Sequence, residues 1–247
     1  MRSFLRALLL LAVPAAAFAW STEAEVRIAK KAAMLAPPDL RLLLEKYESD
    51  YLRGVRDAAE DTSESRHRER VAGRRGAIRT ELAARVGSAL RAVRTRQPMR
   101  DLVYELGLTA HIVADANNPL RVGENDFGPA VEADYEAYFS RKLGRFPTVF
   151  YGLRDEGEVQ AVVNHAIARS RRFNALLEEE YHRDGRLRSS ADFDDRSTAF
   201  GIASISYSRA VSDLVNVFYA VWKEAGGDVR TAQIMKKGNL LLNEDGR

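Results

Sequence analysis

Residues 99–121 read MRDLVYELGLTAHIVADANNPLR, and this stretch decides the fold. Its apolar residues recur at the spacing of a buried helix, and Pro119 ends the run. His111 and Asp115 lie one helical turn apart within it, so their side chains project from the same face. A histidine and a carboxylate at this spacing could bind a single cation, which makes this helix the candidate metal-binding element.

Helical periodicity dominates the rest of the chain, and no alternating strand pattern is convincing. The expected fold class is therefore all-α, with one compact multi-helix domain. Asp39 and Asp101 are expected to cap helices. Residues 54–75 are charged and contain Gly54, so they are expected to form a loop with at most a short helix. Outside that loop we expect helices at 23–35, 40–51, 79–95, 130–143, 158–181 and 198–225, in addition to the one that carries His111.

The amino terminus has the features of a secretory signal. Two arginines, a short apolar core and the small-x-small sequence at 17–19 predict cleavage after residue 19. The apolar core is too short to span a bilayer comfortably, so no membrane-spanning segment is expected in the mature chain. We therefore expect a signal peptide at 1–19, a helical domain at 20–247, and a secreted or periplasmic protein whose first residue is Trp20.

Composition rules out a disulfide-stabilised protein and argues against one that binds nucleic acid by its net positive charge. The chain has no cysteine, so an exported form has no disulfide framework and depends on packing, with or without a metal. Lys and Arg total 38 against 35 Asp and Glu, and two of the arginines lie in the predicted signal peptide. A nearly neutral mature chain argues against a protein that holds nucleic acid by bulk positive charge.

The His111 segment resembles the signature of the zinc-dependent phospholipases C and the fungal single-strand-specific nucleases. That pattern is His, three residues, Asp, three residues, Pro, one residue, His, and the chain matches it at His111, Asp115 and Pro119. Arg121 stands in place of the last His, and an arginine cannot ligate zinc. The resemblance implies a helical fold with a metal cleft that acts on phosphate esters.

A second resemblance lies at the expected mature terminus. The family begins with a Trp whose amine and carbonyl bind zinc, followed by a His five residues later. This chain has Trp20 and, at the His position, Glu25. The resemblance implies that Trp20 and Glu25 assist a second ion bridged by Asp115, although Glu25 could equally pair with a free terminal amine.

The principal ion of the family needs an Asp and a His from the loop before the long helix. His67 is the only histidine in that loop, and Asp57 and Asp61 are the candidate carboxylates, with a slight preference for Asp61. The resemblance thus implies a zinc site at His67, His111, Asp115 and one of the two aspartates, with Asp61 and Asp115 as candidate catalytic groups. The alternative for His67 is a solvated side chain in an arginine-rich loop, whose arginines form a solvated face or contact phosphate.

The third zinc site of the family is expected to be lost. Where the family has two His and a Glu, the chain has Arg121, Glu132 and Glu136. We hypothesise that the guanidinium of Arg121 replaces the ion and pairs with one or both glutamates. The alternative is that both glutamates face solvent. His165 and His182 match no ligand position and are expected to have surface or packing roles.

Two functions follow from the resemblance. The first is a phospholipase C-like hydrolase of phosphate esters that holds one or two zinc ions, with lipid and nucleic-acid substrates both open. The second is a catalytically inactive relative, stabilised by metal, that binds a ligand. No protein partner is evident from the sequence.

Overall fold

The computed structural model describes residues 20–71, 74–154, 158–235 and 240–242. The predicted signal peptide lies outside the described residues. The chain forms a single compact domain of helices, which confirms the expected all-α class. None of the helices within the described ranges combines the length and apolar character needed to cross a membrane. The helices in chain order are α1 (Thr22–Met34), α2 (Pro38–Lys46), α3 (Glu48–Ala59), α4 (Glu64–His67), α5 (Ile78–Arg94), α6 (Met99–Asn117), α7 (Pro119–Val122), α8 (Phe127–Lys142), α9 (Val159–Tyr181), α10 (Thr198–Glu224) and α11 (Ala232–Met235).

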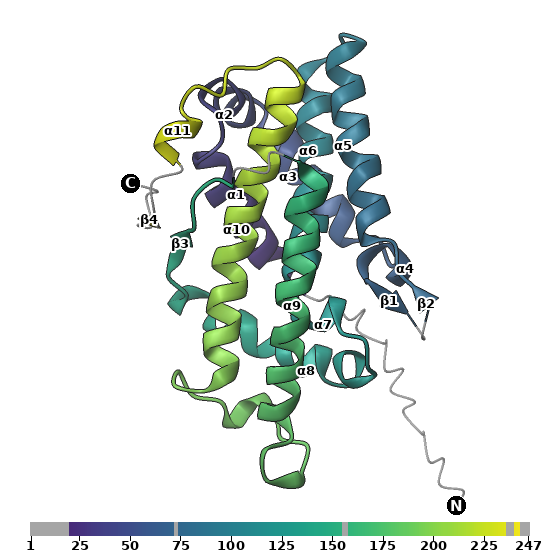
Figure 1. Ribbon diagram of the computed structural model, residues 1–247, viewed down its shortest axis with the longest axis vertical. Helices are drawn as coiled ribbons and strands as arrows, with labels where there is room; N and C mark the ends of the chain where they lie inside the picture. Colours follow the sequence, from purple (N-terminus) through teal and green to yellow (C-terminus); the bar gives the residue numbers. More distant parts are fainter. Residues whose placement is uncertain (1–19, 72–73, 155–157, 236–239, 243–247) are drawn as a thin grey trace, which may run out of the picture.

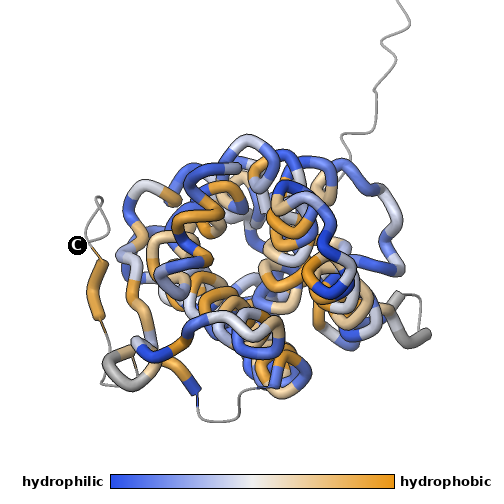
Figure 2. Tube along the Cα trace, turned by 90° about the horizontal axis from the view of Figure 1, so that it is seen from above, coloured by the Kyte–Doolittle hydropathy of each residue, from blue (hydrophilic) through white to orange (hydrophobic). Residues whose placement is uncertain are grey.

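The helix α6 forms the centre of the bundle. It packs against α1, α3, α5, α9 and α10, and nearly every residue from Leu102 to Asn117 is buried. Figure 1 shows α9 and α10 running side by side along the length of the molecule. Figure 2 shows the molecule from above, coloured by hydropathy. Hydrophobic stretches occur within the helices, and the connections at the rim are mostly hydrophilic. A helix that is apolar on all sides is stable only when it is surrounded in this way.

Two expected helix caps are wrong. The structure starts α2 at Pro38 and α6 at Met99, so Asp39 and Asp101 lie in the first turn of each helix rather than at its cap. Proline at or just before the first helical position, with its fixed φ, favours these earlier starts. Each carboxylate still faces the positive end of its helix dipole. The last long helix ends as expected, because Gly226 adopts a left-handed φ of 83°.

The expected loop at 54–75 is wrong over its first part, because α3 continues to Ala59. Gly54 does not break the helix but lets α3 approach α6. A Cβ on Gly54 would lie 2.3 Å from the carbonyl oxygen of Tyr104, and one on Gly107 would lie 2.1 Å from the carbonyl oxygen of Tyr51. The two glycines therefore allow backbone-to-backbone contact between the helices. This contact holds α3 against α6, and Asp61 follows two residues after the end of α3.

Short strands occur where no strand was expected. β1 (Arg70–Val71) pairs with β2 (Arg74–Arg75), and β3 (Thr148–Phe150) pairs with β4 (Leu240–Leu242), both antiparallel. Strands of two or three residues are too short to produce an alternating pattern, so periodicity alone does not reveal them. Three 3-10 turns complete the described elements, at Leu143–Arg145, Arg183–Gly185 and Ser190–Asp192.

Replacing Gly54 with alanine tests the helix contact. Alanine improves intrinsic helix propensity by about 1 kcal/mol, but its methyl group would overlap the α6 backbone. We expect Gly54→Ala to lower the free energy of unfolding by about 1–3 kcal/mol in urea denaturation. Gly201→Ala in α10 is the matched control, because open space surrounds that position. The control should be neutral or stabilising by about 0.5–1 kcal/mol, and equal effects at both glycines would contradict the interpretation.

Candidate metal centre

His111 and Asp115 lie on one face of α6, as their spacing predicts. Both side chains are buried, with exposed fractions of 6% and 2%. The atoms His111 Nε2 and Asp115 Oδ2 are 3.2 Å apart. A histidine and a carboxylate buried together on a central helix need further polar partners, because burial of unpaired charge is unfavourable.

His67 completes the cluster from the short helix α4. Its Nδ1 lies 2.9 Å from Asp115 Oδ2 and 2.9 Å from His111 Nε2. The two imidazole rings meet edge to face, with an interplanar angle of 77°. His67 is 5% exposed, so the alternative of a solvated histidine is wrong. These three side chains could together hold a metal ion.

Each imidazole has a carboxylate at its other nitrogen. Glu25 of α1 lies 2.7 Å from His111 Nδ1 through its Oε2, and Asp61 Oδ2 lies 3.5 Å from His67 Nε2. A carboxylate that accepts a hydrogen bond here, as Glu25 does, fixes the tautomer and orientation of a metal-binding histidine, while Asp61 lies at ion-pair distance only. Glu25 and Asp61 therefore lie behind the histidines, on the side away from the point where the three ligand atoms converge.

Opposing effects set the charges of the cluster. Burial alone would lower the pKa of His111, but the carboxylates of Glu25 and Asp115 raise that pKa to about 10. Burial would likewise raise the pKa of Asp115, but His111 and His67 hold it well below its usual range. Burial raises the pKa of Glu25 despite its contact with His111. Without an ion, His111 therefore stays protonated at neutral pH. Its Nε2 faces His67 and Asp115, so a metal ion and a proton would compete for that atom.

The expected charge replacement by Arg121 is present in part. Arg121 on α7 and Glu132 on α8 are both buried, with Arg121 Nε 2.9 Å from Glu132 Oε1. Arg121 also acts electrostatically on Glu136, lowering its pKa, but burial and the charge of Glu132 raise that pKa to about 7. The alternative of a solvent-facing Glu132 is wrong, while Glu136 is partly exposed.

Arg68 is a site residue that sequence reasoning missed. It was grouped with the arginines of a solvated or phosphate-contacting loop, yet it is 4% exposed and forms an ion pair with Glu132. It also donates to the carbonyl oxygen of Leu120 at 3.1 Å. Its place directly after His67 is the only signal that could have indicated burial. Glu132 therefore has two guanidinium partners, Arg68 and Arg121.

The side chains of Asp57 and Trp20, two other residues of the expected metal centre, contact other partners. Asp57 accepts a hydrogen bond from the hydroxyl of Tyr104 at 2.9 Å. Trp20 is buried and stacks on Phe139, with ring centroids 4.9 Å apart. Of the two candidate aspartates, the structure therefore places Asp61 beside His67 and not Asp57.

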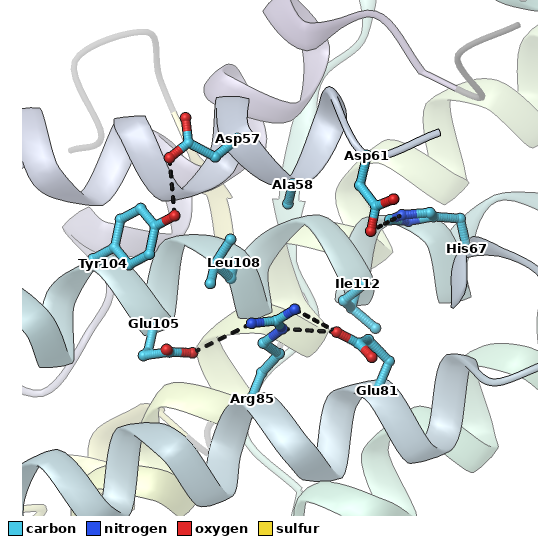
Figure 3. A pocket seen from close by; sticks show the side chains of 10 residues that line it. All are labelled: Asp57, Ala58, Asp61, His67, Glu81, Arg85, Tyr104, Glu105, Leu108 and Ile112. Atoms are coloured by element: carbon cyan, nitrogen blue, oxygen red, sulfur yellow. Dashed lines mark hydrogen bonds and ion pairs between the residues drawn. The ribbon is translucent and has the colours of Figure 1, made fainter. Parts of the chain in front are cut away.

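A pocket of about 260 Å³, lined by residues of α3, α5 and α6, reaches His67, the one residue of the cluster in its lining. Figure 3 shows Asp61 pointing toward His67 at one end and the hydrogen bond from Tyr104 to Asp57 at the other. Arg85 lies between them and forms ion pairs with Glu81 and Glu105. Carboxylates outnumber cations in the lining, which is Asp57, Ala58, Asp61, His67, Glu81, Arg85, Tyr104, Glu105, Leu108 and Ile112.

No protein-family model matches the chain, and a comparison with curated proteins finds no match.

Removing Arg121 tests the buried ion pair. Arg121→Ala would leave Arg68 as the remaining cationic partner of the buried Glu132, so we expect the free energy of unfolding to fall by about 1.5–3 kcal/mol. Lys30→Ala is the control, because the pair of Lys30 with Glu48 is about half exposed and should contribute less than about 1 kcal/mol. Urea denaturation measures both values. Similar small losses in the two variants would show that the pair does not stabilise the fold.

The raised pKa of Glu136 predicts that the stability of the fold falls as the pH rises. Because its pKa in the folded state is about 7, above the ordinary value of 4.5, its ionisation opposes folding as the pH rises from 4.5 through 7. Glu136→Gln should therefore match the parent protein at pH 4 and be more stable at pH 8. Glu179→Gln, at an exposed position on α9, controls for the loss of one negative charge. Equal stabilisation of Glu136→Gln at both pH values would contradict the assignment.

Proposed function

We propose that this protein is an exported zinc-dependent phosphoesterase with a reduced metal centre of one principal ion. One observation carries the proposal: the convergence of His67 Nδ1, His111 Nε2 and Asp115 Oδ2, each 2.9–3.2 Å from the other two atoms. Ligand atoms around a tetrahedral zinc ion are separated by roughly 3.3 Å, given metal–ligand distances of about 2.0–2.1 Å. The donor set and its spacing therefore fit zinc.

The arrangement behind the histidines supports a metal over a simple ion-pair cluster. His67 Nδ1 and His111 Nε2 lie 2.9 Å apart and both face Asp115 Oδ2, so three potential ligand atoms are directed at one place. Glu25 and Asp61 occupy the nitrogens that would carry protons when the opposite nitrogens bind a metal.

Three protein ligands are typical of catalytic zinc sites, which keep a position for water or substrate. Zinc bound in this way lowers the pKa of its water and polarises a phosphoryl oxygen. Asp61 lines the pocket next to His67 and remains ionised at neutral pH: burial would raise its pKa, but the Ser63 amide, His67 and Arg66 lower it. Asp61 lies behind His67 and would orient that imidazole toward the ion, while Asp115 would be the carboxylate ligand between the two imidazoles.

The second and third ions of the resembling family are replaced here. Glu25 is engaged with His111 rather than held ready for a further ion. Arg68 and Arg121 neutralise Glu132 where the third ion would lie. We accordingly assign one ion to the centre.

The charge of the pocket bears on the substrate. Its four carboxylates face Arg85 and His67, so the lining repels a polyanion. This favours a small phosphodiester with a cationic group over nucleic acid. Export belongs to the same proposal and rests on the leader that the sequence of residues 1–19 predicts.

A second candidate is a metal-stabilised binding protein without catalytic activity. The deep burial of all three ligands favours it, because structural metal sites are closed to solvent. Under this alternative the ion stabilises the fold and the pocket binds a ligand without turnover.

Metal content and turnover, measured on the same preparation, separate the two functions. We expect about one zinc per processed chain by elemental analysis, and hydrolysis of p-nitrophenyl phosphorylcholine faster than of bis-p-nitrophenyl phosphate. His67→Gln and Asp115→Asn should lose the ion and the activity together, and Glu25→Gln should weaken zinc binding by about 10- to 100-fold. Asp57→Asn is the control and should retain zinc, because Asp57 contacts Tyr104 and not the cluster.

Zinc content and turnover together distinguish the two candidate functions. One zinc with turnover supports the phosphoesterase, and one zinc without turnover on either substrate supports the binding protein. Far less than one zinc per chain and no turnover would overturn both.

A further inference from the structure

A second pocket lies on a different part of the molecule and has the opposite charge. It has a volume of about 590 Å³ and is formed by α9, α10 and the segment after β3. No residue lines both this pocket and the one beside His67. Figure 1 shows α9 and α10 side by side, with the β3 segment alongside α10. The described lining residues are Leu153, Arg154, His165, Ala168, Arg169, Arg172 and Arg209.

Positive charge is in excess in this arginine pocket. Among the described lining residues four are arginines and none is acidic. The carboxylate of Asp213 is buried beneath them. Its Oδ2 lies 2.6 Å from Arg169 Nη2, and its Oδ1 lies 3.8 Å from Arg154 Nη2. One carboxylate is thus shared by two guanidinium groups. Arg172 is exposed at the rim, on the same face of α9 as Arg169 and His165.

Arg209 shows that this excess charge is partly desolvated. Its Nε is buried without a hydrogen-bond partner among the described residues, and its guanidinium lies 3.5 Å from the ring centroid of Tyr151. Stacking on an aromatic ring orients a guanidinium and leaves its in-plane N–H groups free to bind an acceptor. A buried cationic donor without an acceptor is unfavourable unless a ligand supplies one.

We infer that the arginine pocket binds a small phosphate compound with two or more negative charges. Planar guanidinium groups from α9, α10 and the β3 segment converge on one hollow, and phosphate oxygens accept two hydrogen bonds from each such group. The volume suits a small molecule rather than a single monovalent anion. This inference does not depend on the metal centre or on its activity.

Binding of inorganic pyrophosphate, measured by isothermal titration calorimetry, tests the inference. Titrations are made on the wild-type chain and on His67→Gln, in which the metal cluster no longer competes for pyrophosphate. We expect one pyrophosphate per chain in both proteins, with affinity that falls as salt rises. Inorganic phosphate should bind more weakly than pyrophosphate, and sulfate should compete with both.

Substitutions in the His67→Gln background locate the site. Arg172→Gln and Arg209→Gln should each weaken pyrophosphate binding by about tenfold or more. Arg172 is exposed, so its variant remains informative if Arg209→Gln fails to fold. Arg100→Gln makes the same charge change at an exposed position of α6 outside the pocket and should leave binding unchanged.

Several results would overturn the inference. These are no binding at millimolar pyrophosphate, binding that neither pocket variant weakens, or binding that His67→Gln alone abolishes. Tight binding of a single-stranded oligonucleotide without binding of pyrophosphate would also overturn it and would assign the surface to nucleic acid.

Discussion

The contact between Asp115 and the two imidazoles of His67 and His111 is the constraint on which the rest of the structure depends. Three ionisable groups are held together away from water, an arrangement that is unfavourable unless their charges are compensated. A metal ion or a retained proton can provide that compensation. The carboxylates of Glu25 and Asp61 restrict the outer nitrogens and leave the inner ones directed at a common point. Elements as distant in sequence as α1, α4 and α6 are thereby fixed relative to one another.

Two arginines compensate the buried charge of Glu132. Arg68 and Arg121 both form ion pairs with this carboxylate, so a negative group is held in the interior by fixed cations. Guanidinium groups stay charged and are planar, so these pairs restrain α7 and α8 near the cluster. Any chemistry of phosphate esters would be concentrated at the remaining cluster and at the pocket beside it.

Much of the fold was predictable from the sequence, because long amphipathic or wholly apolar helices have a strong period. The pairing of His111 with Asp115 was predictable for the same reason. The continuation of α3 through Gly54 was not, because it depends on contact with α6, far away in the sequence. Likewise the burial of Arg68 depends on Glu132, which no local pattern connects to it. The role of Glu25 behind His111, rather than as a ligand, depends on which ring nitrogen it meets, and only coordinates decide that.

The position of His67 has a kinetic consequence. Its helix α4 is only four residues long and lies in the connection between α3 and α5. Backbone hydrogen bonds from Glu69 to Arg121 and from Gly76 to Glu69 anchor this connection. Local opening requires far less free energy than global unfolding when few contacts are broken. An ion held beneath the connection would therefore exchange with solvent when these anchors open, and its residence time would report their strength rather than the stability of the whole bundle.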